Sequence, residues 1–255
     1  MTDINAHASN SSFEFDALRE AHNYRRGLMR EFGPFLGGRI IEIGAGVGQF
    51  TELLAGRPGV SQILAIEPEP RFCLEFRTRH PTIPLVEGTM QSAQPKPDWD
   101  SIVSVNVLEH IERDLDELRD YHRVLQGRRG RLCLFVPARP EIYSPIDRDF
   151  GHFRRYVRAE LTGKLQTAGF RVLRLHYFNL IGYLAWWWTF RVLKQRSFNL
   201  GSVRLFDRGI FPVSSFLERR VMRPPIGQSL VAIAEAVQPS GGSDSEASCA
   251  IRPEA

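Results

Sequence analysis

The ten residues IEIGAGVGQF, at positions 41–50, decide the fold of this chain. A short β-branched run ends in closely spaced glycines and passes into an amphipathic segment, which predicts a strand, a tight turn and a helix. Glycine at such a turn lets the backbone pass close to a ligand. Nineteen residues beyond Gly48 a second apolar run ends in Glu67, and a carboxylate at that strand tip can accept both hydroxyls of a ribose. Together these features indicate an adenosine-type ligand at the carboxyl edge of a sheet.

Short apolar runs alternate with longer amphipathic segments on both sides of this stretch. The runs predicted as strands are 39–43, 62–67, 83–88, 101–106, 131–137, 170–178 and 229–237. The segments predicted as helices are 13–35, 48–55, 69–79, 113–125 and 158–168. Near-continuous apolar strands separated by helices are typical of a parallel sheet covered on both faces. The sequence therefore predicts an α/β fold with a seven-stranded, mostly parallel sheet flanked by helices.

The composition is that of an ordinary globular chain. Its 255 residues are 43% hydrophobic and 24% charged, which permits a full core in one domain, expected over 13–238. The polar ends, 1–12 and 239–255, are expected to be disordered. The three cysteines show no ligand or disulfide spacing, so no metal site is expected. The N-terminus does not read as a secretory signal, so a cytoplasmic location is expected.

About fifty residues separate the last two predicted strands, far more than an ordinary connection. Residues 174–223 carry nine Lys and Arg against two acidic residues, and 175–190 contain three consecutive tryptophans and no charged residue. Part of that run belongs to a strand, which leaves too little for a membrane span. The insertion, about 179–228, suits a peripheral membrane contact, or a helical cap or dimer contact. The charge of residues 174–223, nine basic minus two acidic residues, exceeds the formal net charge of +4 of the whole chain. The rest of the chain is therefore slightly acidic, and nucleic acid is not expected as a partner.

The glycine pattern favours one adenosine ligand over another. In the dinucleotide fingerprint GxGxxG the third glycine stands three positions after the second, and here that position is Gln49. The pattern GxGxG preceded by Glu42 fits S-adenosylmethionine, which has no pyrophosphate, better than NAD.

Several blocks in the same order resemble the class I S-adenosylmethionine-dependent methyltransferases. They are EIGAGVGQFT (42–51), AIEP (65–68), WDSIVSVNVLEHI (99–111), HRVLQGRRGRLCLFVPA (122–138) and AGF (168–170). The resemblance implies a Rossmann-like sheet, with the helical insertion placed before the last strand. It also implies S-adenosyl-L-methionine as the cofactor.

The resemblance carries the cofactor contacts over to specific positions. These are Glu42, Gly44, Ala45, Gly46, Gly48, Glu67, Pro68, Thr89, Met90, Asn106 and Val107. Many relatives have an acidic residue directly after the glycine that ends the third strand, but here Gly88 is followed by Thr89. Met90 is therefore expected to pack on the adenine, with Thr89 or a backbone group as its polar contact; an ordinary core role for Met90 is the alternative.

Candidate residues for binding and activating the methyl acceptor follow the fourth and fifth strands. His110 follows the fourth strand, and the block DFGHFRRY, 149–156, contains His152 and Tyr156. It resembles a subset of these methyltransferases with a GHxRRY block. A histidine can serve as the base and an arginine can bind an anionic group.

The predicted catalytic residues are His152, His110 and Tyr156, and the predicted substrate contacts are Arg154, Arg155, Tyr143 and Trp187. The alternative for the two arginines is a structural turn in which they pair with Asp147, Asp149 or Glu160.

Methyl transfer from a sulfonium needs alignment and exclusion of water, and a base only if the acceptor must lose a proton. The resemblance therefore implies a methyltransferase. Similar aromatic-rich insertions occur in relatives associated with cell-surface polysaccharide or lipid-linked sugar pathways, so we expect it to O-methylate a small-molecule, sugar or lipid-linked acceptor. The alternative is a non-catalytic protein that keeps the cofactor fold and docks on a membrane or a protein partner.

Overall fold

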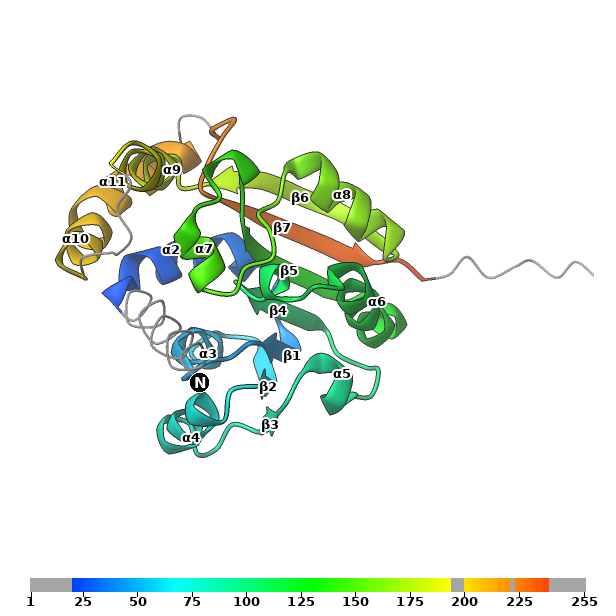
Figure 1. Cartoon of the computed structure of the whole chain (residues 1–255). Coiled ribbons are helices and arrows are strands. Elements are labelled where there is room, and N and C mark those ends of the chain that lie inside the picture. The colour runs from blue at the N-terminus through cyan, green and yellow to red at the C-terminus, as the bar shows by residue number, and fades with distance from the viewer. Residues whose placement is uncertain (1–19, 194–199, 221–222, 239–255) are drawn as a thin grey trace, which may run out of the picture.

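A computed structural model describes residues 20–193, 200–220 and 223–238. Its seven strands form one sheet in the order β3-β2-β1-β4-β5-β7-β6 (Figure 1). They are β1 (Gly38–Ile43), β2 (Val60–Glu67), β3 (Leu85–Glu87), β4 (Ser101–Val105), β5 (Arg131–Pro137), β6 (Phe170–Phe178) and β7 (Ser229–Ala236). The first five pair in parallel, and β7 runs antiparallel to both β5 and β6. The predicted seven-stranded, mostly parallel sheet is confirmed.

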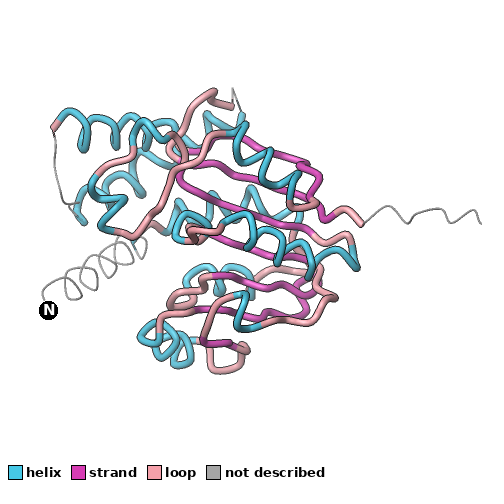
Figure 2. The backbone as a smooth tube through the Cα atoms, turned by 45° about the vertical axis from the view of Figure 1, so that its right-hand side comes forward, coloured by secondary structure: helices cyan, strands magenta, loops and turns pink. Residues whose placement is uncertain are grey.

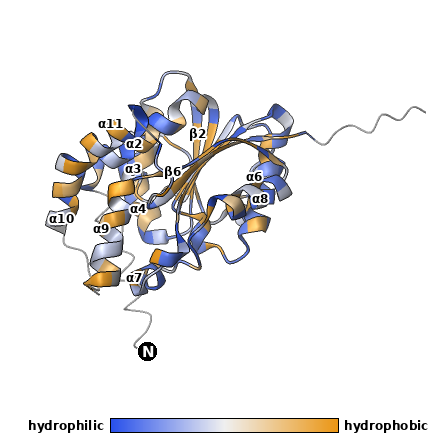
Figure 3. Cartoon of the chain, turned by 90° about the horizontal axis from the view of Figure 1, so that it is seen from above, coloured by the Kyte–Doolittle hydropathy of each residue, from blue (hydrophilic) through white to orange (hydrophobic). Residues whose placement is uncertain are grey.

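Helices cover both faces of this sheet, as Figure 2 shows. The α-helices are α2 (His22–Phe32), α3 (Gln49–Ala55), α4 (Pro70–Arg79), α5 (Met90–Ala93), α6 (Asp114–Leu125), α7 (Pro145–Asp149), α8 (Arg158–Thr167), α9 (Leu180–Trp186), α10 (Leu200–Leu205) and α11 (Phe211–Arg220). Seen from above, α6 and α8 lie on one side of the sheet and α2 and α3 on the other (Figure 3).

The core has two layers because successive side chains of each strand point to opposite faces. On β1, Ile41 and Ile43 join the apolar cluster beneath α6 and α8, whereas Ile40 joins the cluster beneath α2 and α3. On β4, Ile102 joins the cluster beneath α6 and α8, and Val103 joins the cluster beneath α2 and α3. Both faces are therefore buried, which explains the near-continuous apolar strands of the sequence.

The predicted bounds differ from the structure in a few places. The third strand begins only at Leu85, because Pro84 has no N–H to give to the ladder. The helix predicted over 13–35 is interrupted at Ala21 (φ −87°, ψ 58°), so α2 runs from His22 to Phe32 and is followed by a 3₁₀ turn, Gly33–Phe35. Residues 13–19 and the predicted disordered ends lie outside the described residues.

Two short helices were not predicted. In α7, Ser144 and Asp147 form a reciprocal capping box around Pro145. That serine-to-aspartate spacing is a recognisable helix start, so the sequence did contain the signal. In α5, Thr89 and Ser92 form the same arrangement.

The strand order reverses between β1 and β4, which lie side by side while the chain leaves them in opposite directions. In open α/β sheets ligands bind in the crevice outside the carboxyl ends of the strands at such a reversal. At this edge the turn after β1 uses the left-handed backbone of Gly44 (φ 67°), Gly46 (φ 56°) and Gly48 (φ 87°). The fold therefore places the glycine loop where a ligand is expected.

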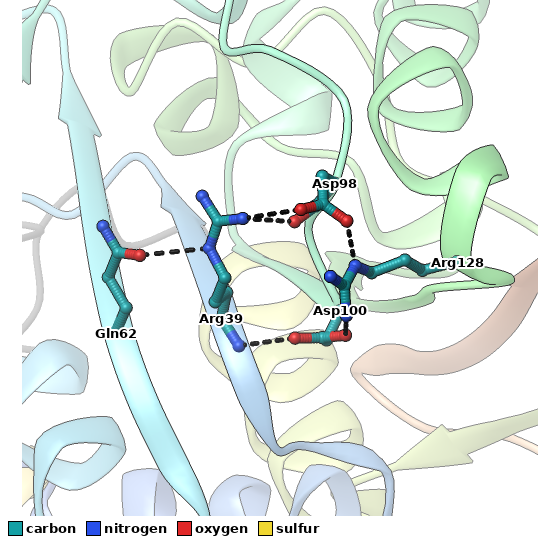
Figure 4. Close-up of polar contacts among 5 residues, drawn as sticks. All are labelled: Arg39, Gln62, Asp98, Asp100 and Arg128. Carbon is teal, nitrogen blue, oxygen red and sulfur yellow. Dashed lines mark hydrogen bonds and ion pairs between the residues drawn. The ribbon is translucent and has the colours of Figure 1, made fainter.

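The opposite edge of the sheet is closed by ion pairs (Figure 4). Arg39 donates from its backbone to Asp100 at 2.8 Å, from Nε to Gln62 at 3.0 Å and from Nη1 to Asp98 Oδ2 at 3.0 Å. Arg128 binds Asp98 as well, and this hydrogen bond lowers the pKa of the Asp98 carboxyl. These residues stand at the amino ends of the strands, so their role is to join β1, β2 and the loop before β4.

The insertion forms a helical layer beside α2 (Figure 1). After α9 the chain continues as a π-helical segment, Trp187–Val192, and α10 is joined to α11 by a second one, Phe206–Ile210. Asp207 in that second segment accepts hydrogen bonds from the backbone N–H groups of Asn23 and Tyr24 at 3.0 and 2.8 Å. Within the described ranges, every helix is too short or too polar to cross a bilayer.

Candidate active site

A cavity of about 440 Å³ opens at the carboxyl ends of β1, β2 and β4. The predicted cofactor residues that line it are Glu42, Gly44, Ala45, Gly46, Glu67, Pro68, Thr89, Met90, Asn106 and Val107. Gly48 does not line the cavity. It caps α3 with a left-handed backbone, and a Cβ there would collide with the imidazole of His80. Gly48 is thus required by the turn rather than by contact with a ligand.

The glycine loop and Glu67 hold each other in place. The N–H of Gly46 donates to Glu67 Oε2 at 2.8 Å, and the N–H of Glu69 donates to Oε1 at 2.9 Å. A carboxylate has about four acceptor positions, so both oxygens retain capacity for a ligand's hydroxyls. A Cβ on Gly44 would collide with Val107, so the loop is packed against the end of β4.

Three buried carboxyl groups line the cavity: those of Glu42, Glu67 and Glu117. Burial raises the pKa of Glu42 to about 8, even though Thr51 Oγ1 donates to it at 2.5 Å. Burial also raises the pKa of Glu117 to about 7 and that of Glu67 above its usual value. Keeping three such acids in one apolar pocket opposes folding, and a positively charged ligand would offset that cost.

Helix α2 supplies part of the cavity wall that the sequence did not predict. Tyr24, Arg25 and Leu28 all face the cavity. Arg25 is the arginine among the lining residues, and its Nη1 donates to Gln49 Oε1 at 3.3 Å, next to the glycine loop. The amphipathic pattern predicts this helix but not the element that it covers, because that contact is set by tertiary packing.

The histidines predicted for the acceptor side come together. His110, in the 3₁₀ turn Leu108–His110, lines the cavity, and the His152 ring lies edge-on to it with centroids 4.6 Å apart. His152 does not itself line the cavity; it is buried one ring further back. Phe150, from the same loop, does line it.

A buried carboxylate orients His152. Asp147 Oδ1 lies 3.2 Å from His152 Nδ1 and accepts from Arg155 Nε at 2.7 Å, and Ser144 Oγ donates to Oδ2 at 2.9 Å. Burial alone would raise the pKa of Asp147, but the hydrogen bonds from His152 and Arg155 hold that pKa below its usual value. With Nδ1 engaged by Asp147, Nε2 is the nitrogen through which this ring would accept a proton.

Both arginines of the GHxRRY block are ion-paired. Arg155 is buried, pairs with Asp147, and stacks on Trp186 with its guanidinium carbon 4.5 Å from the ring centroid. Arg154 pairs with Asp114 at 2.8 Å. Neither lines the cavity, so the structural alternative describes them better than the substrate contact, although Asp114 was not among the partners considered.

Tyr156 and Tyr143 also hold the framework. Tyr156 is fully buried away from the cavity, and its hydroxyl donates to Asp114 Oδ2 at 2.8 Å. Tyr143 donates to the backbone carbonyl of His152 at 2.8 Å. Both therefore position the loop between β5 and α8, residues 138–157, which we call the acceptor loop, and we do not place either among the reacting groups.

The three consecutive tryptophans do not share one face of the insertion. Trp186 is buried and donates from Nε1 to the carbonyl of Ile142 at 3.2 Å. Trp187 and Trp188 are exposed, at 44% and 54%. Trp187 does not line the cavity, so the insertion contacts the acceptor loop through Trp186.

Comparisons with known proteins identify the family. A family model described as a methyltransferase domain matches residues 16–175, and the chain therefore belongs to the methyltransferase-domain family. The expected cofactor, S-adenosyl-L-methionine, follows from this membership. Among curated proteins no sequence matches.

Solved structures show the same fold. A chain in a complex between the Haloferax volcanii Trm112 methyltransferase activator and a methyltransferase is 17% identical, with a TM-score of 0.59 and coverage of 91% of this chain and 95% of that one. A TehB-like SAM-dependent methyltransferase from Corynebacterium glutamicum is 18% identical, with a TM-score of 0.51 and coverage of 83% and 88%. A SAM-dependent methyltransferase from Archaeoglobus fulgidus is 16% identical, with a TM-score of 0.53 and coverage of 81% and 90%.

The residues of the cavity fit this cofactor. Its sulfonium and ammonium groups carry positive charge, which suits a wall with three carboxyl groups. Apolar side chains that follow β2, β3 and β4, those of Phe72, Met90 and Ile111, offer a surface for the adenine. The two negative charges of an NAD pyrophosphate would meet the same carboxyl groups unfavourably.

We expect Arg25 to bind the carboxylate of the cofactor's methionine part. The substitution Arg25→Ala should weaken binding of S-adenosylmethionine about tenfold, the usual effect of losing one charged hydrogen bond. The neighbouring Arg26→Ala removes an exposed arginine of the same helix and should leave binding unchanged. Titration calorimetry with decarboxylated S-adenosylmethionine completes the test. That analogue lacks the carboxylate, so the unchanged protein and Arg25→Ala should bind it equally. An equal loss for both ligands would contradict this role.

We expect Glu42 to destabilise the cofactor-free protein at alkaline pH. Its folded pKa of about 8 lies above the ordinary value of 4.5, so stability is lost as the pH rises between these values and the full penalty applies above pH 8. Glu42→Gln should therefore raise the melting temperature by roughly 5–10 °C at about pH 8.5 and very little at about pH 5. A difference that does not change with pH in thermal unfolding would contradict the raised pKa.

Proposed function

We propose that this methyltransferase transfers a methyl group to a hydroxyl oxygen of a small-molecule, sugar or lipid-linked acceptor. The observation that carries the proposal is the Asp147–His152 pair, set beside His110 at the wall of the cavity. A hydroxyl must lose its proton as the methyl group arrives, and an imidazole oriented by a carboxylate is suited to take it.

When bound, S-adenosyl-L-methionine supplies a methyl group already activated by a positively charged sulfur. The chain itself has to align the acceptor and exclude water. His110 at the cavity wall would contact the acceptor, and the hydroxyl proton would pass through the His110 ring to His152 Nε2 behind it as the oxygen–methyl bond forms. Asp147 stabilises the imidazolium that results, and Arg155 and Ser144 hold Asp147 in position.

One observation favours a second chemistry for the same groups. Glu109, His110 and His152 each bring a ligand atom within 4.8 Å of the others, a set that could hold a metal ion. The sequence predicts no metal, and we propose that the histidines act by proton transfer. Dialysis against EDTA tests this choice, since activity should survive it. Activity that is lost and then restored by Mg²⁺ or Mn²⁺ would assign the cluster to a metal.

The alternative function is a non-catalytic protein that keeps the cofactor fold. A protein of similar fold occurs in a complex with the Trm112 methyltransferase activator, which favours docking on a protein partner under this alternative. The half-buried His110 at the cavity wall, with the buried and oriented His152 behind it, favours catalysis instead.

Labelled cofactor tests the proposed function directly. Incubation of the protein with methyl-labelled S-adenosylmethionine and a cell extract should move the label into an acceptor, which phase separation assigns to the lipid or the aqueous fraction. The ether bond formed should resist mild alkali, whereas a methyl ester would be hydrolysed. Label that never leaves the cofactor would favour the non-catalytic alternative, and alkali-labile label would contradict O-methylation of a hydroxyl.

A further inference from the structure

The insertion presents an apolar outer surface. The large apolar side chains that it exposes are Leu184, Trp187, Trp188, Val192, Leu193, Leu205, Ile210, Val213, Phe216 and Leu217. The rest of the described chain exposes only Leu74, Phe153, Leu173 and Val237 among large apolar side chains. Single exposed apolar residues are normal, but a concentration on one element marks an interaction site. Figure 3 shows hydrophobic segments on α9, α10 and α11, at the side of the molecule away from α6 and α8.

These side chains follow helical spacing. Leu184, Trp187 and Trp188 stand at i, i+3 and i+4, and Val213, Phe216 and Leu217 repeat that spacing on the neighbouring helix. The inward face of the first helix is occupied by Trp186 and Phe190, which pack on Ile142 and Ile146 of the acceptor loop. This helical layer therefore has two apolar faces: one packs against the acceptor loop, and the other is turned outward.

The acidic side chains of the insertion face the protein, whereas several of its arginines are exposed. Both acidic side chains are used internally: Asp207 binds the backbone of α2, and Glu218 accepts from the N–H groups of Asn179 and Leu180 at 3.0 and 2.8 Å. Arg208, Arg219 and Arg220 are exposed. Arg220 stands seven residues after Val213 and so lies on the exposed apolar side of α11, which therefore combines apolar and cationic side chains.

We propose that this surface, the outer face of α9–α11, docks on an anionic lipid bilayer. Exposed tryptophans beside arginines suit the boundary between headgroups and acyl chains, where the ring is half buried and the cations meet anionic headgroups. The helices lie on the bilayer, since none of the described ones is able to cross it. A second copy of the chain in a two-fold contact would bring the same arginines against one another, which opposes that occupant.

Docking would place the bilayer against the helical layer that packs on the acceptor loop. Trp186, the last residue of α9 and the one before Trp187, stacks on Arg155, which in turn pairs with Asp147. If the proposed methyl transfer holds, the acceptor that this arrangement serves is the lipid-linked one. The docking itself rests on the surface alone and is tested without turnover.

Vesicle sedimentation tests the surface. The full chain should pellet with phosphatidylcholine vesicles containing about 30% phosphatidylglycerol and much less with phosphatidylcholine alone. Raising the salt from about 0.1 M to about 0.5 M should release it, because the cationic part of the contact is screened. Arg219→Glu with Arg220→Glu, and separately Trp187→Ser with Trp188→Ser, should each lower the bound fraction about tenfold. Failure to pellet on anionic vesicles at low salt would overturn the proposal.

Two further measurements guard against misfolding and other occupants. Leu74→Ser on α4 removes a side chain that is 70% exposed, away from the insertion (Figure 1), and should pellet like the unchanged protein. Each variant should retain S-adenosylmethionine binding, which shows that it is folded. Loss of pelleting in Leu74→Ser, or a dimer that the tryptophan variants abolish in place of vesicle binding, would overturn lipid docking.

Tryptophan fluorescence gives an independent readout. Trp187 and Trp188 are exposed whereas Trp99 and Trp186 are buried, so anionic vesicles should shift the emission of the unchanged protein to shorter wavelengths. Trp187→Phe with Trp188→Phe should still pellet but lose the shift. A shift that persists in this variant would contradict contact through these two indoles.

Discussion

Replacing Glu67 with alanine should lower the affinity for S-adenosylmethionine by about 100-fold, the largest binding effect that we expect from a single side chain. The carboxylate does two things at once. We expect it to accept the ribose hydroxyls at the tip of β2, and it accepts hydrogen bonds from the N–H groups of Gly46 and Glu69. Removing it takes away the ligand contacts and loosens the glycine loop together.

Two matched variants isolate the effect. Glu67→Gln keeps one carbonyl acceptor and should lose about tenfold. Glu69→Ala removes a neighbouring carboxylate that pairs with Arg71, and it should bind normally, since only its backbone N–H meets Glu67. Calorimetry on the three proteins decides the matter. Equal affinities for Glu67→Ala and Glu69→Ala would contradict the ribose role.

Replacing His152 with alanine should lower kcat by at least about 100-fold while the cofactor affinity stays within about threefold. The ring does not line the cavity, so its loss should spare cofactor binding. Asp147→Asn should also lower kcat, because the amide leaves the imidazolium without its carboxylate. Unchanged turnover in His152→Ala would remove this residue from the mechanism.

Tyr156→Phe provides the comparison for this block. Its hydroxyl bonds Asp114 and the carbonyl of Leu108 away from the cavity, so the variant should melt at a lower temperature and keep most of its kcat. A loss of kcat as large as that of His152→Ala, with the melting temperature unchanged, would place Tyr156 among the reacting groups.

The strands and the glycine loop could be predicted because their signals are local. The apolar runs are short and bounded, and the distance from Gly48 to Glu67 fixes two consecutive strand ends on one edge of a parallel sheet. The cavity accordingly contains nearly all of the residues predicted to bind the cofactor. Gly48 is the exception, since the same pattern serves both the ligand and the turn.

The partners of the two arginines could not be predicted from the sequence. Arg154 and Arg155 are adjacent, yet one binds Asp114 at the start of α6 and the other binds Asp147 in α7. The first pairing depends on how α6 and the acceptor loop pack, which no spacing in the sequence records. Arg25 was missed for the same reason, because its place at the cavity follows from how α2 lies over the sheet.

We expect the cavity at the carboxyl edge of β1, β2 and β4 to be the binding site of S-adenosyl-L-methionine. Titration calorimetry of the unchanged protein tests it most directly, with NAD as the competing adenosine ligand. We predict one bound S-adenosylmethionine per chain with a Kd of about 1–100 µM, displaced by S-adenosylhomocysteine and unaffected by NAD. Binding of NAD without binding of S-adenosylmethionine would contradict the account.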